Sequence, residues 1–274
     1  MQYELLGPLR IVTDQSVILI NAPKIETVLR VLLVRANQIV STTQLISEIW
    51  GDRPPRRATA AVHVYISNIR RRLSTENAGS VPLATRSPGY TMILSPEDLD
   101  LTRFRRLARQ GRRLMFDGLY EEAYQAFDDA LALWRAPVEP FAEGPIMNGF
   151  CTAVEEIRLE CVELLVEASL RLGHHRSTVS ELHQLVSEYP FHEAFYGQLM
   201  RALYQSKRRA EALSVYSDLR RVLNSELGLE PGPALRALQH GILTDTVGPV
   251  EDRPLGALSD HPRAAAGQPR DSSG

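Results

Sequence analysis

One stretch of the sequence, Ala58 to Leu73, constrains what the rest of the chain can fold into. An α-helix turns by about 100° per residue, and at that angle four bulky apolar residues of the stretch fall on one side. They recur at the i, i+4, i+7 and i+11 spacing of a buried helix face: Val62, Ile66, Ile69 and Leu73. The opposite side carries small, hydrogen-bonding and cationic side chains: Ala60, His63, Val64, Ser67, Asn68, Arg70 and Arg71. We therefore expect an amphipathic helix with a polar, basic outer face.

That outer face fits two different environments. In a DNA major groove, small side chains leave room for the helix, polar groups meet base edges and cations meet phosphates. On an ordinary surface helix, the same arginines are simply solvated. Arg72 lies on the flank nearer the buried stripe, so we expect it to face solvent or an intramolecular partner. Arg70 and Arg71 point to the outer side, and in the DNA interpretation their long cationic side chains are expected to reach phosphates, or bases in the case of Arg71.

Charge is divided unevenly along the chain and favours the DNA interpretation. Residues 1–95 contain 11 Lys and Arg against 6 Asp and Glu, whereas residues 96–274 contain 20 against 27. A basic N-terminal part on an acidic body is the asymmetry expected when one end of a protein contacts nucleic acid.

The segments around the helix predict a small α+β domain. Short β-prone runs, helical spacing and turn residues predict these elements in order: strands at 3–6, 9–13 and 17–20, helices at 24–37 and 42–50, a helix at 58–73, and strands at 81–85 and 90–94. Ser41 or Thr42 is placed to cap the second helix, and Ile39-Val40 reads as an extended link. Three strands, three helices and a basic hairpin are the layout of a winged helix-turn-helix. Thr85 and Arg86, in the hairpin or wing, are expected to contact the DNA backbone or minor groove.

The loop before the organising helix, DRPPRR at 52–57, is predicted to lie outside both neighbouring helices. Pro54 and Pro55 lack a backbone donor and restrict the residue before them, so neither flanking helix extends into the loop. We expect a stiff cationic surface loop. Its arginines are Arg53, Arg56 and Arg57.

The remainder of the chain is predicted to be helical. Residues 95–100, SPEDLD, read as a short polar hinge, and residues 101–244 show helix pairs that repeat with small and bulky residues at packing spacing, as in tetratricopeptide repeats. Residues 245–274 are poor in aromatic and β-branched residues and are expected to be disordered. The predicted domains are therefore 1–95, 96–244 and a tail at 245–274, in a mainly α chain.

Several motifs resemble a known family. LISEIWG at 45–51, the VxVxIxxIR series at 62–70 and TRSPGY at 85–90 resemble the effector domain of OmpR/PhoB-type response regulators. The runs at 188–216 and 226–238 resemble the bacterial transcriptional activator domain. Together, over roughly residues 1–244, they resemble the Streptomyces antibiotic regulatory protein (SARP) family. No receiver domain precedes the first predicted strand, so we do not expect a phosphorylation-switched two-component regulator.

The resemblance implies a mechanism of recruitment. It implies tandem copies on direct repeats of double-stranded promoter DNA, activating a secondary-metabolite (antibiotic) cluster. The loop with Arg53, Pro54, Pro55, Arg56 and Arg57 occupies the place where OmpR-like regulators touch RNA polymerase, through its sigma factor and other subunits. Arg56 and Arg57 can equally contact phosphate. Trp50 belongs in the core by its ring, and the family implies that its Trp-Gly position lies near the DNA backbone.

Catalytic and cofactor chemistry finds no support in the sequence. GxGxxG, P-loop, GxSxG and HExxH patterns are absent, and we expect no enzyme activity, cofactor or metal. Cys151 and Cys161 read as reduced core thiols, His174-His175 as surface residues and Trp134 as a core anchor. Without a signal peptide or a membrane-length apolar run, a cytoplasmic protein with no membrane contact is expected.

Two other functions remain open at the level of sequence. One is an adaptor whose helical repeats bind a peptide while the winged domain does not bind DNA. The other is a ligand-responsive regulator whose helical domain senses a small molecule, although the sequence shows no obvious polar-lined pocket.

Overall fold

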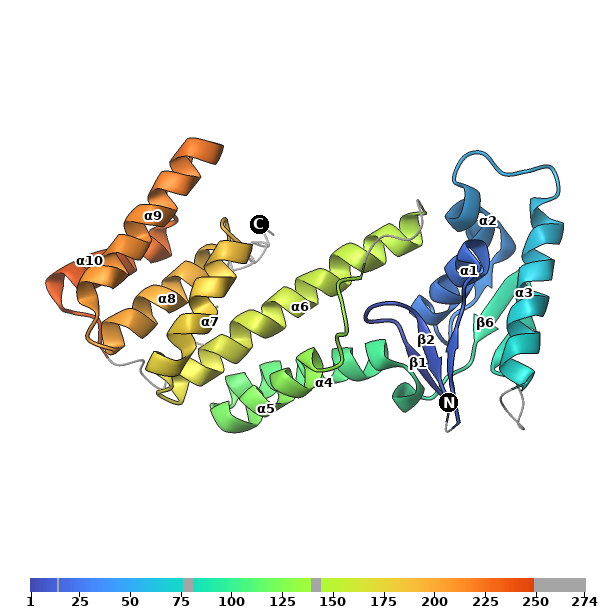
Figure 1. Cartoon of the computed structure of the whole chain (residues 1–274), viewed down its shortest axis with the longest axis horizontal. Coiled ribbons are helices and arrows are strands. Elements are labelled where there is room, and N and C mark those ends of the chain that lie inside the picture. The colour runs from blue at the N-terminus through green and yellow to red at the C-terminus, as the bar shows by residue number, and fades with distance from the viewer. Residues whose placement is uncertain (14, 76–80, 139–143, 249–274) are drawn as a thin grey trace, which may run out of the picture.

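The computed structural model describes residues 1–13, 15–75, 81–138 and 144–248. We call residues 1–95 the head and residues 96–244 the helical part. The molecule is elongated, with the head at one end and the last helices at the other (Figure 1). It is mainly helical, as the sequence predicted.

Two small antiparallel sheets frame the head. The first, β1-β2-β3, joins Gln2–Glu4, Arg10–Val12 and Val17–Leu19. The second, β4-β6-β5, joins Val40–Ser41, Gly89–Met92 and Leu83–Arg86. The predicted strands are confirmed to within about two residues. The expected extended link at Ile39-Val40 is in part a strand, because Val40 pairs with Tyr90 and Ser41 with Gly89.

The described residues of the head also form three helices: α1 (Pro23–Val34), α2 (Thr42–Trp50) and α3 (Ala58–Thr75). The Ser41 side chain accepts a hydrogen bond from the Gln44 backbone and the Gln44 side chain accepts one from the Ser41 backbone, a reciprocal cap that starts α2. The predicted stripe of α3 is confirmed, since its four residues are each at most 1% exposed: Val62, Ile66, Ile69 and Leu73.

The expected hinge at 95–100 is wrong. Pro96–Asp98 form a single 3-10 turn, η1, and Leu99 is 2% exposed. The next residue, Asp100, is buried and accepts hydrogen bonds from the backbone N–H groups of Leu5 (2.8 Å) and Leu6 (3.0 Å). This polar run reads as a hinge in the sequence because its partners lie more than 90 residues earlier.

Over its described residues, 96–138 and 144–244, the helical part contains seven α-helices, and consecutive helices pack on one another: α4 (Asp100–Phe116), α5 (Tyr120–Leu131), α6 (Pro145–Arg171), α7 (His175–Glu188), α8 (Glu193–Gln205), α9 (Arg209–Leu227) and α10 (Pro233–Thr244). One hydrophobic core runs from Tyr3 in the head to Ala168 in α6, and a second begins at Val166 and ends at Ile242. The long helix α6 therefore belongs to both cores and connects the head with α7–α10 (Figure 1).

The structure tests the predicted disorder of residues 245–274 only over the first four of them, 245–248. Residues 249–274 lie outside the described residues. Residues 245–248 are ordered rather than disordered, because the Tyr204 hydroxyl donates to Asp245 Oδ1 at 2.5 Å and Gln205 Nε2 donates to the Gly248 carbonyl at 3.3 Å. No helix in the described ranges has the length and apolar character needed to cross a membrane.

Candidate nucleic-acid interface

The outward side of α3 is open to solvent along its middle. His63, Val64 and Ser67 are exposed, and Val64 is 56% exposed although it is apolar. An exposed branched aliphatic side chain on a polar helix face is the type that contacts a thymine methyl group in the major groove. The Ser67 hydroxyl donates to the His63 carbonyl at 2.9 Å, so in this state it bonds its own helix.

Arg71 extends this face by one turn. It is exposed, and its Nη2 donates to Asn68 Oδ1 at 2.6 Å. The contact joins residues three apart on one helix face and holds the guanidinium beside a second hydrogen-bonding side chain. The structure thus brings Asn68 and Arg71 together as the sequence predicted they would be placed.

Arg70 lies differently from its prediction. It is half-buried and turns toward the wing, where its Nε donates to the Leu83 carbonyl at 3.2 Å and its Nη2 donates to Thr85 Oγ1 at 2.7 Å. The guanidinium carbon also lies 6.0 Å from the centre of the Tyr90 ring. Two of its donor groups are used within the protein, so Arg70 braces α3 against the wing instead of presenting a free cation.

The wing is the β5–β6 hairpin, and its tip is fixed to the start of α2. Thr85 and Arg86 are exposed on it. A Cβ at Gly89 would collide with the Val40 backbone, so this position requires glycine. The Thr42 backbone N–H donates to the Pro88 carbonyl at 3.3 Å. The wing, the start of α2 and α3 thus form one connected surface.

Trp50 packs inside this assembly. Its ring stacks on Tyr65 of α3, with centroids 6.2 Å apart and planes at 29°, and Lys24 Nζ lies 5.1 Å from the ring centre. Trp50 is half-buried. The prediction that its ring belongs to the core is confirmed, and its role here is to set the position of α3.

The 52–57 loop lies outside both neighbouring helices, as predicted. Its five side chains of interest are all exposed: Arg53, Pro54, Pro55, Arg56 and Arg57. Backbone hydrogen bonds hold each end, from Arg53 to Trp50 at 3.1 Å and from Ala58 to Pro55 at 3.0 Å. In the described part of the chain none of its arginines forms an ion pair, and the loop arches away from the head (Figure 1).

A basic feature outside the head escaped the sequence interpretation. Helix α4 contains the run RFRRLARQGRR at 103–113, and burial lowers the pKa of Arg105, with repulsion from Arg109 and from Arg35 of the head adding to the effect. Arg105 and Arg109 thus lie close enough to the head to feel its charge, whereas the other arginines of the run are paired with carboxylates: Arg103, Arg106, Arg112 and Arg113. The run of arginines was a visible signal, but the overall acidic balance of residues 96–274 concealed it.

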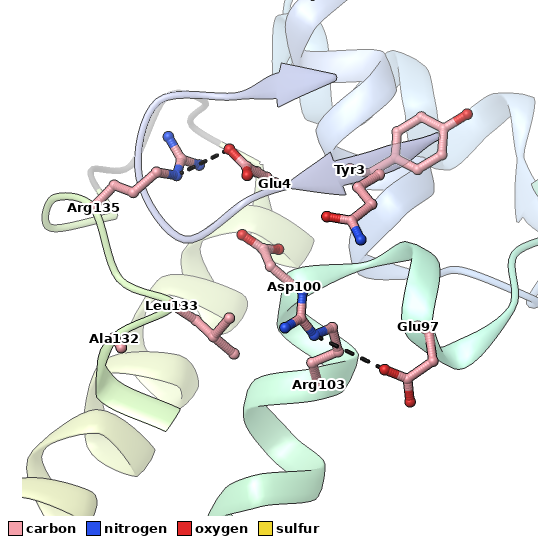
Figure 2. Close-up of a pocket in the computed structure, with 9 residues that line it drawn as sticks. Tyr3, Glu4, Glu97, Asp100, Arg103, Ala132, Leu133 and Arg135 are labelled. Atoms are coloured by element: carbon pink, nitrogen blue, oxygen red, sulfur yellow. Dashed lines mark ion pairs between the residues drawn. The ribbon is translucent and has the colours of Figure 1, made fainter. Parts of the chain in front are cut away.

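The junction between head and helical part holds a small polar cavity of about 120 Å³ (Figure 2). Arg135 Nε lies 3.3 Å from Glu4 Oε2, and Arg103 Nε lies 3.9 Å from Glu97 Oε2. Asp100 also lines it, with its oxygens occupied by backbone N–H groups. The Arg135–Glu4 ion pair and the Asp100 hydrogen bonds join the two parts, whereas Arg103 and Glu97 both belong to the helical part. No group of three His, Cys, Asp or Glu in the described ranges is placed to hold a metal ion.

Comparison of the sequence with known protein families assigns the chain to a family. Residues 20–92 match the family described as transcriptional regulatory protein, C terminal, and residues 99–243 match the bacterial transcriptional activator domain. The two models cover the head and the helical part in the order that the fold shows. The chain belongs to the SARP family of transcriptional regulators.

Individual relatives agree with this assignment. The regulatory protein DnrI of Streptomyces peucetius is 34% identical, over 89% of this SARP chain and 92% of the relative. The transcriptional regulatory protein MoaR1 of Mycobacterium tuberculosis is 34% identical, over 92% and 81%. The solved structure of Mycobacterium tuberculosis EmbR in complex with a low affinity phosphopeptide superposes with a TM-score of 0.86 at 32% identity. This chain is covered over 92% of its length and spans 66% of that one.

Proposed function

We propose that this SARP regulator is a sequence-specific activator that reads promoter DNA with α3 and flanking backbone with the wing. The observation that carries the proposal is the division of α3 into a fully buried stripe and an outer face with Val64, Ser67 and Arg71 exposed. The face combines an apolar contact, polar groups and a cation, which are the three kinds of contact that base edges and phosphates accept. His63 and Asn68 complete it, Arg86 reaches backbone from the wing, and Arg70, Thr85 and Trp50 hold the parts in place.

Two copies in tandem on direct repeats follow from the family resemblance. The basic head and the acidic balance of the rest of the chain support head-to-tail contact between neighbours, because opposite charges then face each other. The gene set, on the same resemblance, is a secondary-metabolite (antibiotic) cluster, and the protein acts in the cytoplasm.

The 52–57 loop is proposed to contact RNA polymerase. Its two prolines leave little conformational entropy to lose on docking, and Arg53, Arg56 and Arg57 are exposed and unpaired within the described residues. Acidic groups on the sigma factor or another subunit are the matching partner chemistry.

The DNA part of the proposal is tested by finding the site and then removing one cation. Sequencing of genomic fragments retained by the purified chain supplies the site and its repeat spacing. Arg71→Ala is then compared with Arg72→Ala, a matched control because Arg72 is also exposed but lies about 100° further round the helix, toward the buried stripe. Arg71→Ala should weaken binding to the specific site by about 1–3 kcal/mol, with a smaller effect on random DNA. Equal loss on both DNAs would make Arg71 a phosphate contact, and no loss would remove it from the site.

The polymerase part is tested by separating binding from activation. Replacing Arg53, Pro54 and Pro55 with Ala should leave promoter affinity almost unchanged and reduce run-off transcription by the bound promoter complex. A parallel fall in both readouts would place the loop in the DNA interface instead.

A further inference from the structure

A groove in the helical part has no role in the proposed function. The sequence showed no obvious polar-lined pocket in this part, and the structure has a cavity of about 450 Å³ between α6, α8 and α10. Leucines form its apolar lining, namely Leu164, Leu235 and Leu238. Its volume falls in the range of sites that enclose small organic molecules.

One side chain in this groove has an unused hydrogen-bonding group. Gln198 is 4% exposed, and its Nε2 donates to the Glu163 carbonyl at 2.9 Å. That bond fixes the amide orientation, because a flipped amide would place two acceptors against each other. Its Oε1 is buried and has no hydrogen-bond partner in the part of the chain that the structure describes. A buried acceptor of this kind is incomplete until a donor reaches it.

The charges around Gln198 favour a cationic donor. Three carboxylates line the groove against two guanidinium groups. Both guanidinium groups are committed to one carboxylate, since Arg171 and Arg201 contact Glu167 at 2.9 and 3.4 Å. Within the described residues neither Glu163 nor Glu193 is paired with a Lys or Arg side chain: Glu163 contacts the His192 ring, and Glu193 accepts a hydrogen bond from the Gly232 backbone N–H. A second cavity shares Glu163 and is lined by three more glutamates, of which Glu155 and Glu160 are paired with Arg158 and Arg112 and Glu156 is not in an ion pair within the described residues.

We propose that this groove binds a small amphipathic molecule with a primary ammonium group and an apolar body. The ammonium donates to Gln198 Oε1 and lies in the field of Glu163. The apolar body covers the three leucines. An ammonium offers three donors and no acceptor, so it completes Gln198 without adding an unsatisfied acceptor.

Tryptamine is the probe. The control ligand is 3-(indol-3-yl)propionate, which has the same ring but a carboxylate in place of the amine. Binding to the full chain is measured without DNA by calorimetry and ligand-observed NMR, so the result is independent of the regulator's DNA function. Tryptamine should bind, and the propionate should bind at least about tenfold more weakly. Gln198→Leu should weaken tryptamine binding by about tenfold or more, because it removes the acceptor.

Gly197→Leu tests whether the ligand occupies the groove, because the new side chain should fill it. The control is the same substitution, glycine to leucine, at a site away from the groove. A Cβ at Gly197 meets its nearest neighbour, Leu235 Cδ2, at 3.9 Å, so the helix accepts it and the longer side chain fills the groove. Gly149→Leu makes the same change on α6 at an exposed site with nothing within 4 Å of a Cβ. Tryptamine binding should be lost in the first variant and retained in the second. No binding by tryptamine at 10 mM, equal binding by both probes, or unchanged binding in Gly197→Leu would overturn the proposal.

Discussion

Glu48 of α2 caps the N-terminus of α6, with its Oε1 2.7 Å from the backbone nitrogen of Ile146 and its Oε2 3.2 Å from that of Met147. Glu48 is 2% exposed, and the first N–H groups of a helix have no partner inside the helix. A carboxylate placed there also meets the positive end of the helix dipole. One buried side chain thus ties the α2–α3 unit of the head to the helix that leads to α7–α10.

Replacing Glu48 with Gln should destabilise this junction. In this variant the side-chain NH₂ group replaces one carboxylate oxygen and faces a backbone N–H of α6, so that buried N–H loses its acceptor. The negative charge at the N-terminus of α6 is removed as well. We expect the free energy of unfolding to fall by about 1–3 kcal/mol, measured by urea denaturation. Glu156→Gln, an exposed change on α6, is the control and should have little effect. An equal effect of the two changes would show that the cap contributes no stability.

The pattern of neighbouring residues in the sequence was enough to predict the elements of the head. It was not enough to predict the contacts that join the head to the helical part. The stripe of α3, the cap of α2 and the wing depend on residues close in sequence, and each was predictable. Glu48 and Asp100 look like ordinary polar residues of a helix and a hinge, because their partners lie about 95 residues away. Arg70 and Arg71 are consecutive, so their side chains leave the helix about 100° apart. That difference in direction turns Arg70 toward the wing and leaves Arg71 facing solvent.

The Arg70–Thr85 contact should couple α3 to the wing in DNA binding. Arg70→Ala and Thr85→Ala, alone and together, form a double-mutant cycle read by promoter affinity. The two losses should be less than additive, with a coupling of about 0.5–3 kcal/mol, because either change removes the same 2.7 Å bond. Arg70→Lys should not restore affinity, since one ammonium does not reproduce the two separate bonds of the guanidinium. Additive losses would instead show two independent DNA contacts.

Asp100 should make stability depend on pH in a particular direction. Burial raises the pKa of Asp100 above its ordinary value of 3.8, although hydrogen bonds from Leu5, Leu6 and Leu101 oppose the shift. The folded state therefore binds this proton more tightly than the unfolded state does. Ionisation of Asp100 lowers the free energy of unfolding as pH rises from about 3.8 to the folded pKa.

Asp100→Asn removes that titration and tests the direction. The variant should be less stable at neutral pH by about 1–3 kcal/mol, because its amide nitrogen opposes a backbone donor. Between pH 4 and the folded pKa, the stability of the wild-type chain should rise less steeply with pH than that of Asp100→Asn. A steeper rise in the wild type, from urea denaturation across this window, would mean that hydrogen bonds outweigh burial.

Cys161 should resist alkylation in the native protein. It is 1% exposed, burial raises the pKa of its thiol to about 12, and attraction to Arg112 on α4 only partly opposes the shift. At pH 8 the thiolate fraction is then on the order of 10⁻⁴, against roughly a quarter for an ordinary cysteine. Cys151 is half-buried with a smaller rise in pKa, so it serves as the internal reference.

Iodoacetamide labelling followed by mass spectrometry should modify Cys151 first and Cys161 only after urea is added. If both label at the same rate without urea, α4 separates from α6 in the folded state, and the core between them is looser than its burial indicates.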